Sequence, residues 1–238
     1  MIKTSKFNYG KEDSEFEGSI SFNEDDASPR PGILVVHAYG GHSDFEKNKS
    51  EKLAELGYFS FAVDLYGVGK RGANPEESML LMNELNSNRP LLLERISNSL
   101  KVLKEFNEVD PDKTGAIGFC FGGKCVLDLA RSGAGINGVV SFHGLYDKPN
   151  IDHTSAFKSS VLVLHGYNDP MATPKNMVAL ADELTERKAD WQIHAYSNVG
   201  HAFTNPDATD RNSGLFYDPV ADEHSWNEMK YFFEKIFQ

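Results

Sequence analysis

The chain has 238 residues, a formal net charge of −11 and two cysteines. This length suffices for one α/β domain with a large core, and no linker, repeat or low-complexity segment divides it, so we expect a single domain over residues 1–238. The acidic balance gives no electrostatic basis for binding nucleic acid or an anionic membrane.

Hydrophobic patterning predicts strands that alternate with helices. Residues 16–22 alternate with period two, as in an antiparallel strand with one wet face, whereas residues 32–37 form the continuous apolar run of a central strand. Further strands are predicted over residues 58–65, 114–119, 136–143, 161–165 and 191–196. Helices are predicted over residues 46–56, 76–85, 91–106, 124–130 and 226–236, and another helix is predicted to start after Pro174 and to include residues 177–184. This alternation predicts an α/β fold, with a mostly parallel sheet and helices on both faces.

The most informative motif surrounds Cys120, between a predicted strand and a predicted helix. Residues 118–123 read GFCFGG, which is the G-x-S-x-G nucleophile elbow of α/β-hydrolases with cysteine in place of serine. The glycines stand where a side chain would collide with the neighbouring backbone, and the helix N-terminus favours thiolate over thiol. A free cysteine can also be a small buried hydrophobe, so a catalytic role requires partners elsewhere in the chain.

Candidate partners follow two later strands. Active-site groups of an open α/β sheet gather at the carboxyl ends of its strands. Asp169 follows the strand over residues 161–165, and His201 follows the strand over residues 191–196. The order nucleophile, acid, base is the order of this fold, so we predict a triad in which His201 handles the Cys120 proton and Asp169 fixes the imidazole. The alternative for Asp169, which precedes Pro170, is an ordinary turn residue, and His201 could be an ordinary loop histidine.

Three more histidines, His37, His143 and His165, also stand at predicted strand ends. They could line the active-site cleft or serve as structural hydrogen-bonding groups, and the sequence leaves both readings open. No pair has the spacing of metal ligands, so we expect no catalytic metal.

These residues are together similar to the dienelactone hydrolase family within the α/β-hydrolases, over nearly the whole chain. The similarity rests on residues 118–123, 165–166, 169–170 and 200–206, and also on residues 141–144 and 225–226. It implies an α/β-hydrolase fold with about eight strands and a cofactor-free hydrolase of small-molecule esters, lactones or thioesters. It also implies Cys120 as nucleophile, Asp169 as acid and His201 as base, with the backbone N–H groups of Phe121 and Tyr39 forming the oxyanion hole.

The chain departs from the family pattern at three places. The family glutamate that helps control thiol ionisation is matched by Ala38, and Asp44 or Glu46 would need an unusual loop path to replace it. An arginine that grips the substrate carboxylate close after the catalytic histidine is matched by residues 204–205, which are threonine and asparagine. A second substrate-binding arginine of the family lies on the segment matched by residues 78–81, where this chain has no arginine. Arg71 and Arg89 are nearby in sequence and could compensate, but surface charges are the favoured interpretation of both. Dienelactone itself is therefore a poor substrate candidate, because a bidentate arginine–carboxylate contact is strong and directional.

Without that glutamate, His201 would act on Cys120 directly, either as a standing thiolate–imidazolium pair or by deprotonating a thiol when substrate binds. Pocket-wall candidates are Tyr39, His143, Tyr146 and Phe203, and ordinary core packing is the alternative for the aromatic residues. A ligand-binding protein and a thiol redox sensor are rival functions on the same fold.

The N-terminal segment lacks the apolar core of a signal peptide, and no apolar stretch approaches membrane-spanning length. Cys120 and Cys125 are five residues apart, on a turn and the following helix, which argues against a disulfide. A free thiol in a nucleophile position fits the reducing cytoplasm, which is the location we expect. The sequence is compatible with a monomer or a small homo-oligomer.

Overall fold

The structure is a computed structural model that describes residues 1–10, 15–150 and 157–238. It divides into two compact units, Met1–Ile117 and Gly118–Gln238. Eight strands form a sheet in the order β1-β2-β4-β3-β5-β6-β7-β8, and a separate two-stranded ribbon pairs β9 with β10. The predicted α/β class, with a mostly parallel sheet and helices, is confirmed.

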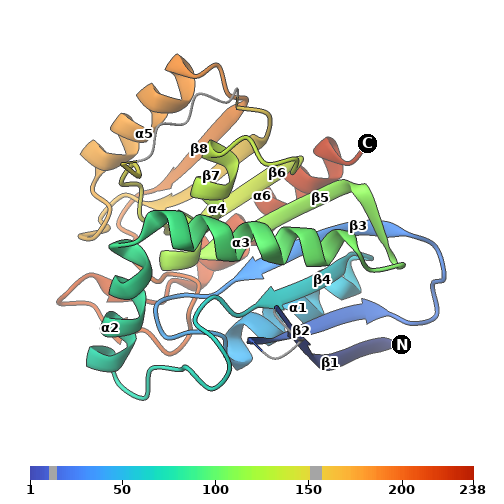
Figure 1. Cartoon of the computed structure of the whole chain (residues 1–238). Coiled ribbons are helices and arrows are strands. Elements are labelled where there is room, and N and C mark those ends of the chain that lie inside the picture. Colours follow the sequence, from blue (N-terminus) through green and yellow to red (C-terminus); the bar gives the residue numbers. More distant parts are fainter. Residues whose placement is uncertain (11–14, 151–156) are drawn as a thin grey trace. The chain divides into compact units, whose positions relative to one another are not determined.

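The first unit contains most of the antiparallel pairing. Its strands are β1 (Ile2–Tyr9), β2 (Phe16–Asn23), β3 (Arg30–Val36), β4 (Phe59–Val63) and the greater part of β5 (Val109–Phe119). Its helices are α1 (Asp44–Glu55), α2 (Pro75–Asn86) and α3 (Arg89–Lys104). β2 pairs antiparallel with β1 and β4, whereas β3 and β4 are parallel. Figure 1 shows α3 in front of these strands and α1 behind them, so β3 is covered on both faces.

That coverage explains the composition of β3. Its four residues from Ile33 to Val36 are fully buried, as the continuous apolar run predicts for a central strand. On one face Gly32 makes room for α3, since a Cβ there would lie 3.1 Å from the Cγ of Leu103. Loss of that space would push α3 away from the sheet.

The second unit is parallel throughout its part of the sheet. Its strands are β6 (Gly138–Phe142), β7 (Ser160–Gly166), β8 (Trp191–Tyr196), β9 (Thr209–Asp210) and β10 (Leu215–Phe216). Its helices are α4 (Phe121–Arg131), α5 (Pro174–Glu186) and α6 (Pro219–Ile236). β7 pairs in parallel with both β6 and β8, which brings the carboxyl ends of all three strands to one edge.

Helices α4 and α6 cover opposite faces of β6. A Cβ on Gly138 would meet Ile236 and Phe232 of α6, whereas a Cβ on Gly123 of α4 would meet the hydroxyl of Ser141. Gly138 and Ser141 are three residues apart, and strand side chains alternate between faces, so the two helices lie on different sides. The second unit is thus a helix–sheet–helix sandwich.

Helix α6 begins seven residues before the predicted start at residue 226. Asp218 caps it by accepting hydrogen bonds from the N–H groups of Val220 (3.1 Å) and Ala221 (2.9 Å), and Pro219 occupies the first turn. Aspartate followed by proline is a strong helix start, because proline has no N–H to leave unsatisfied and its φ is already helical. The predicted start at residue 226 rests on the apolar stripe alone and does not take this cap into account.

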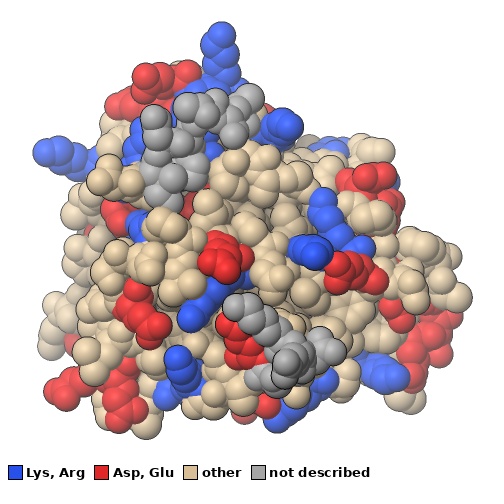
Figure 2. Space-filling model, in the orientation of Figure 1, with Lys and Arg blue, Asp and Glu red and all other residues tan. Residues whose placement is uncertain are grey.

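Charged side chains of both signs are interspersed on the face drawn in Figure 2, with no block of a single sign. This agrees with the dispersed acidic residues of the sequence. Among the described residues, the structure has no helix with the length and apolar composition needed to cross a membrane.

Candidate active site

Cys120 sits in the sharp turn between β5 and α4. Its φ of 54° and ψ of −113° lie in the left-handed region, which a non-glycine residue adopts only under constraint. A Cβ on Gly118 would lie 2.1 Å from the carbonyl oxygen of Gly122, and one on Gly123 would lie 2.6 Å from the hydroxyl of Ser141. The predicted requirement for glycine beside the turn is therefore confirmed at Gly118.

The backbone of Cys120 is held from β6. Its N–H donates to the carbonyl oxygen of Phe142 (3.1 Å) and to Nδ1 of His143 (3.2 Å). The rings of Phe119 and Phe142 stack at 4.8 Å and fix the two strand ends against each other. Only 7% of Cys120 is exposed, and its sulfur does not cap α4. The thiol therefore lies at a helix N-terminus in a largely buried position.

Asp169 and His201 are brought together at the ends of β7 and β8. Nδ1 of His201 lies 2.7 Å from Oδ2 of Asp169, and both side chains are buried. The other oxygen of Asp169 accepts from the N–H groups of Met171 (2.7 Å) and Ala172 (3.0 Å). Asp169 thus stabilises a turn and also contacts a histidine. The turn role and the triad role considered for it from the sequence are therefore compatible.

The backbone of His201 is fixed by the short ribbon that the sequence did not predict. The N–H of His201 donates to the carbonyl of Gly214 (2.8 Å), and its carbonyl accepts from the N–H of Phe216 (3.1 Å). Gly200 lets this ribbon approach, since a Cβ there would lie 2.2 Å from the Gly214 oxygen. The imidazole is therefore held at its backbone as well as through Asp169.

The protonation of His201 reflects two anionic neighbours. Burial alone would lower its pKa, but the negative charge of Cys120 and the hydrogen bond to Asp169 outweigh burial and raise the pKa to about 10. Nε2 of His201 is buried, and a side-chain hydrogen bond with Cys120 also helps to raise the pKa of His201. An imidazolium whose Nδ1 is committed to a carboxylate leaves Nε2 as the nitrogen that can exchange a proton.

His143 uses both ring nitrogens on the protein. Nδ1 accepts from the N–H of Cys120, and Nε2 lies 2.8 Å from Oγ1 of Thr204. Its ring also makes edge-to-face contacts with His201 and Phe203, each at 5.1 Å. These contacts are those of a structural hydrogen-bonding residue, which is one of the two roles that the sequence leaves open for His143. Phe203 is fully buried, and its ring contacts His143 and Tyr196.

Tyr146 and His165 form a second buried pair in this unit. The Tyr146 hydroxyl lies 3.0 Å from Nδ1 of His165, and Nε2 of His165 has no hydrogen-bond partner among the described residues. Burial lowers the pKa of His165 and raises the pKa of Tyr146 well above its usual value, so both side chains are neutral near pH 7. The charge of Asp169 acts on both groups, which places the pair near the predicted acid.

A cavity of about 420 Å³ opens beside Tyr146, but it is not lined by the predicted triad. Its walls come from the segment after β6 and from α5: Tyr146, Asp147, Lys148, Asn176, Ala179, Leu180, Asp182, Glu183 and Glu186. Four of these side chains are acidic. The cavity thus has a charge and a position different from those expected of the site around Cys120.

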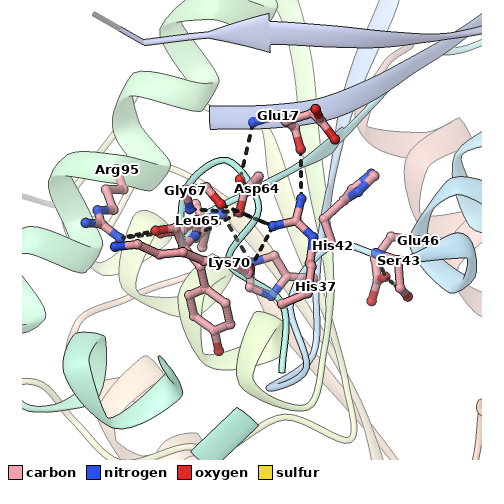
Figure 3. Close-up of polar contacts among 12 residues, drawn as sticks. Glu17, His37, His42, Ser43, Glu46, Asp64, Leu65, Gly67, Lys70 and Arg95 are labelled. Atoms are coloured by element: carbon pink, nitrogen blue, oxygen red, sulfur yellow. Dashed lines mark hydrogen bonds and ion pairs between the residues drawn. The ribbon is translucent and has the colours of Figure 1, made fainter. Parts of the chain in front are cut away.

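In the first unit, the loop after β3 receives a buried carboxylate from α1. Glu46 accepts from the N–H of Ala38 (3.3 Å), the N–H of Ser43 (3.0 Å) and the hydroxyl of Ser43 (2.6 Å). Figure 3 shows Glu46 and Ser43 side by side at the start of α1. Burial raises the pKa of Glu46. No unusual loop path is needed, because an ordinary capping box turns Glu46 back toward Ala38. The S-x-x-E pattern over residues 43–46 was the signal for this contact.

Tyr39 and His37 lie in the same region of the first unit. The Tyr39 carbonyl accepts from the Tyr66 hydroxyl at 3.0 Å, which fixes the peptide group that follows Tyr39. Nε2 of His37 accepts from the N–H of Leu65 (3.1 Å), and Nδ1 contacts the carbonyl of Ala38 (2.7 Å). Burial lowers the pKa of His37 to about 4, so it is a neutral group that binds two loops together.

The prediction that Arg71 and Arg89 are surface charges is wrong. Arg71 forms an ion pair with fully buried Asp64 at 3.2 Å, and it donates to the carbonyl of Glu17 at 3.1 Å. Figure 3 shows Asp64 facing the backbone of Glu17 in β2, to which it is joined by a 3.2 Å hydrogen bond. The side chain of Arg89 is also buried. Arg71 is therefore committed to a structural ion pair within the first unit.

Comparison with known proteins points to one family. Residues 18–237 match the family model described as "Dienelactone hydrolase family". A protein of Aquifex aeolicus (strain VF5) assigned as a carboxymethylenebutenolidase is 28% identical over 209 residues, covering 86% of this chain and 87% of that protein.

Two solved structures are similar over the whole chain. The crystal structure of a dienelactone hydrolase-like promiscuous phosphotriesterase, P91, from metagenomic libraries has a TM-score of 0.92 and 33% identity, covering 100% of this chain and 99% of that one. The structure named m3DLH has a TM-score of 0.93 and 32% identity, with the same coverage.

Proposed function

Because the chain belongs to the dienelactone hydrolase family and is a hydrolase of lactones or carboxylic esters, we propose that it acts through Cys120, His201 and Asp169. In this proposal Cys120 is the nucleophile, His201 transfers the proton and Asp169 orients the imidazole. The substrate is a small-molecule ester, lactone or thioester, and no cofactor takes part. The reducing cytoplasm, where the thiol would stay free, is the proposed location.

The observation that carries the proposal is the buried pair of Asp169 and His201, 2.7 Å apart, together with the influence of Cys120 on it. The Asp169 carboxylate keeps one ring proton on Nδ1 of His201. Nε2 is then the nitrogen that can exchange a proton during the reaction. The negative charge of Cys120 raises the pKa of His201 to about 10 together with Asp169, against the effect of burial. A protonated His201 at neutral pH is what the standing thiolate–imidazolium pair requires, so the raised pKa of His201 supports that version of the proposal.

Acylation then proceeds from the ion pair. The thiolate of Cys120 attacks the carbonyl carbon, a C–S bond forms, and the carbonyl oxygen becomes an oxyanion. As the tetrahedral intermediate collapses, the C–O bond breaks and the proton on Nε2 of His201 passes to the leaving alkoxide. The products of this half-reaction are an alcohol and an acyl-cysteine, and His201 is left neutral.

Deacylation uses the same groups in reverse. Neutral His201 takes a proton from water while the water oxygen attacks the thioester carbonyl, and the C–S bond then breaks. The carboxylic acid departs, and the thiolate–imidazolium pair is restored. In a lactone, alcohol and acid are parts of one molecule, so a single hydroxy acid leaves.

The oxyanion would be stabilised by backbone N–H groups. Phe121 is the first residue of α4, and an N–H at a helix N-terminus points along the helix dipole toward a developing negative charge. The N–H of Tyr39, in the loop after β3, remains the second predicted donor. Removing one such donor from an oxyanion hole typically costs about 10²–10³ in kcat.

A direct test compares wild type with Cys120→Ala on short-chain p-nitrophenyl esters. We expect hydrolysis by wild type and its loss in the variant, with an acyl adduct on intact wild-type protein detected by mass spectrometry. Cys125→Ala is the matched control, because Cys125 is also a buried thiol of α4 but lies outside the proposed triad. Adduct and activity should survive that substitution.

The same assay addresses the rival functions. Saturable binding of the esters without turnover would favour a ligand-binding protein. Reversible sulfenic acid formation at Cys120 without esterase activity would favour a redox sensor. Turnover retained by Cys120→Ala would contradict the proposed nucleophile. Cys120→Ser asks in addition whether the site accepts an oxygen nucleophile.

A second activity, hydrolysis of phosphotriesters, is favoured by the 33% identity to P91, which is described as a promiscuous phosphotriesterase. Here the Cys120 thiolate would attack phosphorus, a P–S bond would form, and the P–O bond to the aryl oxide would break. Water would then release the phosphodiester. With diethyl p-nitrophenyl phosphate we expect p-nitrophenolate release that Cys120→Ala abolishes. Release that continues unchanged in that variant would separate the two activities.

A further inference from the structure

We propose that His143 and Thr204 form a positioning pair that holds the nucleophile backbone and the His201 turn in register for the proposed reaction. His143 follows β6, and Thr204 lies three residues after His201. Neither side chain has a part in the proposed bond-making steps. The expected effect on catalysis rests on the proposed function, whereas the pair itself is defined by hydrogen bonds within the second unit.

The hydrogen bonds require one tautomer of His143. A backbone N–H can only donate, so Nδ1, which faces the N–H of Cys120 at 3.2 Å, must be unprotonated. The ring proton is therefore on Nε2 and is donated to Oγ1 of Thr204 at 2.8 Å. The Thr204 hydroxyl gives this Nε2 proton a buried acceptor and so stabilises the tautomer in which His143 accepts from Cys120. Without the hydroxyl, the Nε2 proton would lose this acceptor, and the other tautomer would set the N–H groups of His143 and Cys120 against each other.

The backbone on both sides of this contact is strained. Cys120 has a φ of 54° and His143 a φ of 37°, both in the region that disfavours side chains. The N–H of His143 donates to the carbonyl of Leu164 (2.8 Å), and the N–H of Cys120 also donates to the carbonyl of Phe142 (3.1 Å). Strained backbone persists only where surrounding contacts determine it, and the imidazole of His143 is one of these contacts.

The same imidazole reaches the proposed base. The rings of His143 and His201 meet edge to face at 5.1 Å, and Phe203 packs against His143 at the same distance. Thr204 is fully buried, and the turn that carries it includes Ala202 with a φ of 58°. One side chain therefore contacts the turn of the proposed nucleophile and the turn of the proposed base. Misplacement by about 1 Å can cost about 10²-fold in rate, so such a link can be felt in kcat.

The test removes one hydroxyl and leaves the shape of its side chain. Thr204→Val keeps the side-chain volume and should lower kcat for p-nitrophenyl acetate about tenfold with KM within twofold, because alignment rather than substrate contact is lost. Thr204→Ser restores the hydroxyl and should recover most of kcat. Thr114→Val, at another fully buried threonine in β5, controls for the cost of a buried valine.

Substitution of His143 tests the other contact. His143→Leu removes both hydrogen bonds and should lower kcat by about 10²-fold. His143→Asn can still accept from Cys120 and tolerates a positive φ, so it should recover activity to the level of Thr204→Val. In the His143→Asn background, Thr204→Val should add no further loss, because the contact is already absent.

The rate of Cys120 alkylation by iodoacetamide provides a readout without turnover. We expect it to fall in Thr204→Val and to recover in Thr204→Ser, while urea unfolding distinguishes local misplacement from loss of fold. The inference is overturned if Thr204→Val keeps kcat and alkylation rate within twofold of wild type, or if KM alone rises. Esterase activity retained by Cys120→Ala would instead refute the proposed function, and the alkylation rates would still report on the pair.

Discussion

Asp169 divides its two carboxylate oxygens between the turn that precedes α5 and the imidazole of His201, which makes one substitution especially informative. In Asp169→Asn the amide oxygen can still accept from Met171 and Ala172, so the turn should survive. The amide nitrogen would then face Nδ1 of His201 as a donor and favour the wrong tautomer. We expect kcat to fall by roughly 10³–10⁴-fold with an unchanged unfolding midpoint, measured by ester hydrolysis and urea denaturation.

The exposed Asp207 provides a matched control, since it follows His201 in the chain and its backbone N–H donates to Asn205. Asp207→Asn should keep full activity. A kcat for Asp169→Asn within tenfold of wild type would mean that the carboxylate does not orient the base.

The raised pKa of His201 predicts a pH dependence of activity. A group with a raised pKa keeps its proton below that pKa and loses it as the pH rises through it, here at about 10. Acylation needs the imidazolium as acid, so kcat/KM should hold at neutral pH and decline as the pH passes about 10. A decline centred near the ordinary histidine value would contradict the standing ion pair.

Removing the thiol tests the cause of that shift. The negative charge of Cys120 is the largest influence that raises the pKa of His201, so Cys120→Ala should lower this pKa. The measurement is the titration of His201 by NMR in both proteins. An unchanged titration would mean that Asp169 alone holds the imidazolium.

Much of this site follows from residue order alone. Cys120, Asp169 and His201 each follow a strand, and the geometry of parallel strands brings strand ends to one edge, so the pairing of Asp169 with His201 could be foreseen. Thr204 could not, because the partner of a buried hydroxyl depends on the path of a turn rather than on any sequence pattern. The same applies to Arg71, whose carboxylate partner Asp64 is seven residues away and on the far side of a loop.

Helices α4 and α5 are joined by a buried cluster of charges. Arg131 donates to Asp128 (3.1 Å) and to both oxygens of Glu183 (3.1 and 2.8 Å), and it also donates to the carbonyl of Tyr146 (3.1 Å). All three charged side chains are at most 9% exposed. Such a cluster is costly to desolvate and still more costly to break, because one removed charge leaves the others uncompensated.

Arg131→Met should therefore lower the free energy of unfolding by about 3–5 kcal/mol at neutral pH, measured by urea denaturation. In a triple variant, Asp128→Leu and Glu183→Leu added to Arg131→Met should restore much of the stability, because a well-packed apolar set replaces the charges. A triple variant less stable than Arg131→Met would contradict this account.

Some of the strands and helices can be predicted from the sequence, and others cannot. The apolar runs of β3, β4, β6 and β7 predict buried strands directly, and α3 follows from its stripe. β1 (Ile2–Tyr9) was missed because few of its side chains are apolar and its aromatic contacts, Phe7 with Phe61 and Phe106, come from distant segments. β9 and β10 are two residues each, too short for any periodicity, and exist because they pair with each other and hold His201.

The net charge of −11 should influence which substrates the protein accepts. A negative field slows the approach of anions, and salt screens it. The family arginine close after the histidine is absent, since Thr204 and Asn205 occupy those positions and Thr204 is buried against His143. We expect p-nitrophenyl butyrate to be hydrolysed with a higher kcat/KM than mono-p-nitrophenyl succinate, which carries a carboxylate.

Ionic strength distinguishes the two causes of this preference. Added salt should raise kcat/KM for the succinate ester and leave the butyrate ester almost unchanged if the long-range field is responsible. A preference that salt does not alter would point to the absent arginine. A higher kcat/KM for the succinate ester at any salt concentration would contradict the prediction.

The prediction of one domain can be tested by unfolding. Both tryptophans, Trp191 and Trp226, belong to the second unit, so tryptophan fluorescence reports on that unit, whereas far-UV circular dichroism reports on both. If the two units unfold as one cooperative domain, their urea transitions should coincide. A circular dichroism transition that leaves the fluorescence unchanged would indicate two domains.

The cluster of Asp128, Arg131 and Glu183 also has an evolutionary consequence. Each single replacement strands a buried charge, so the intermediates between the charged set and an apolar set should be poorly tolerated. Relatives should therefore keep all three residues or lose them together, and correlated substitution at these positions would record the energetic coupling of α4 with α5.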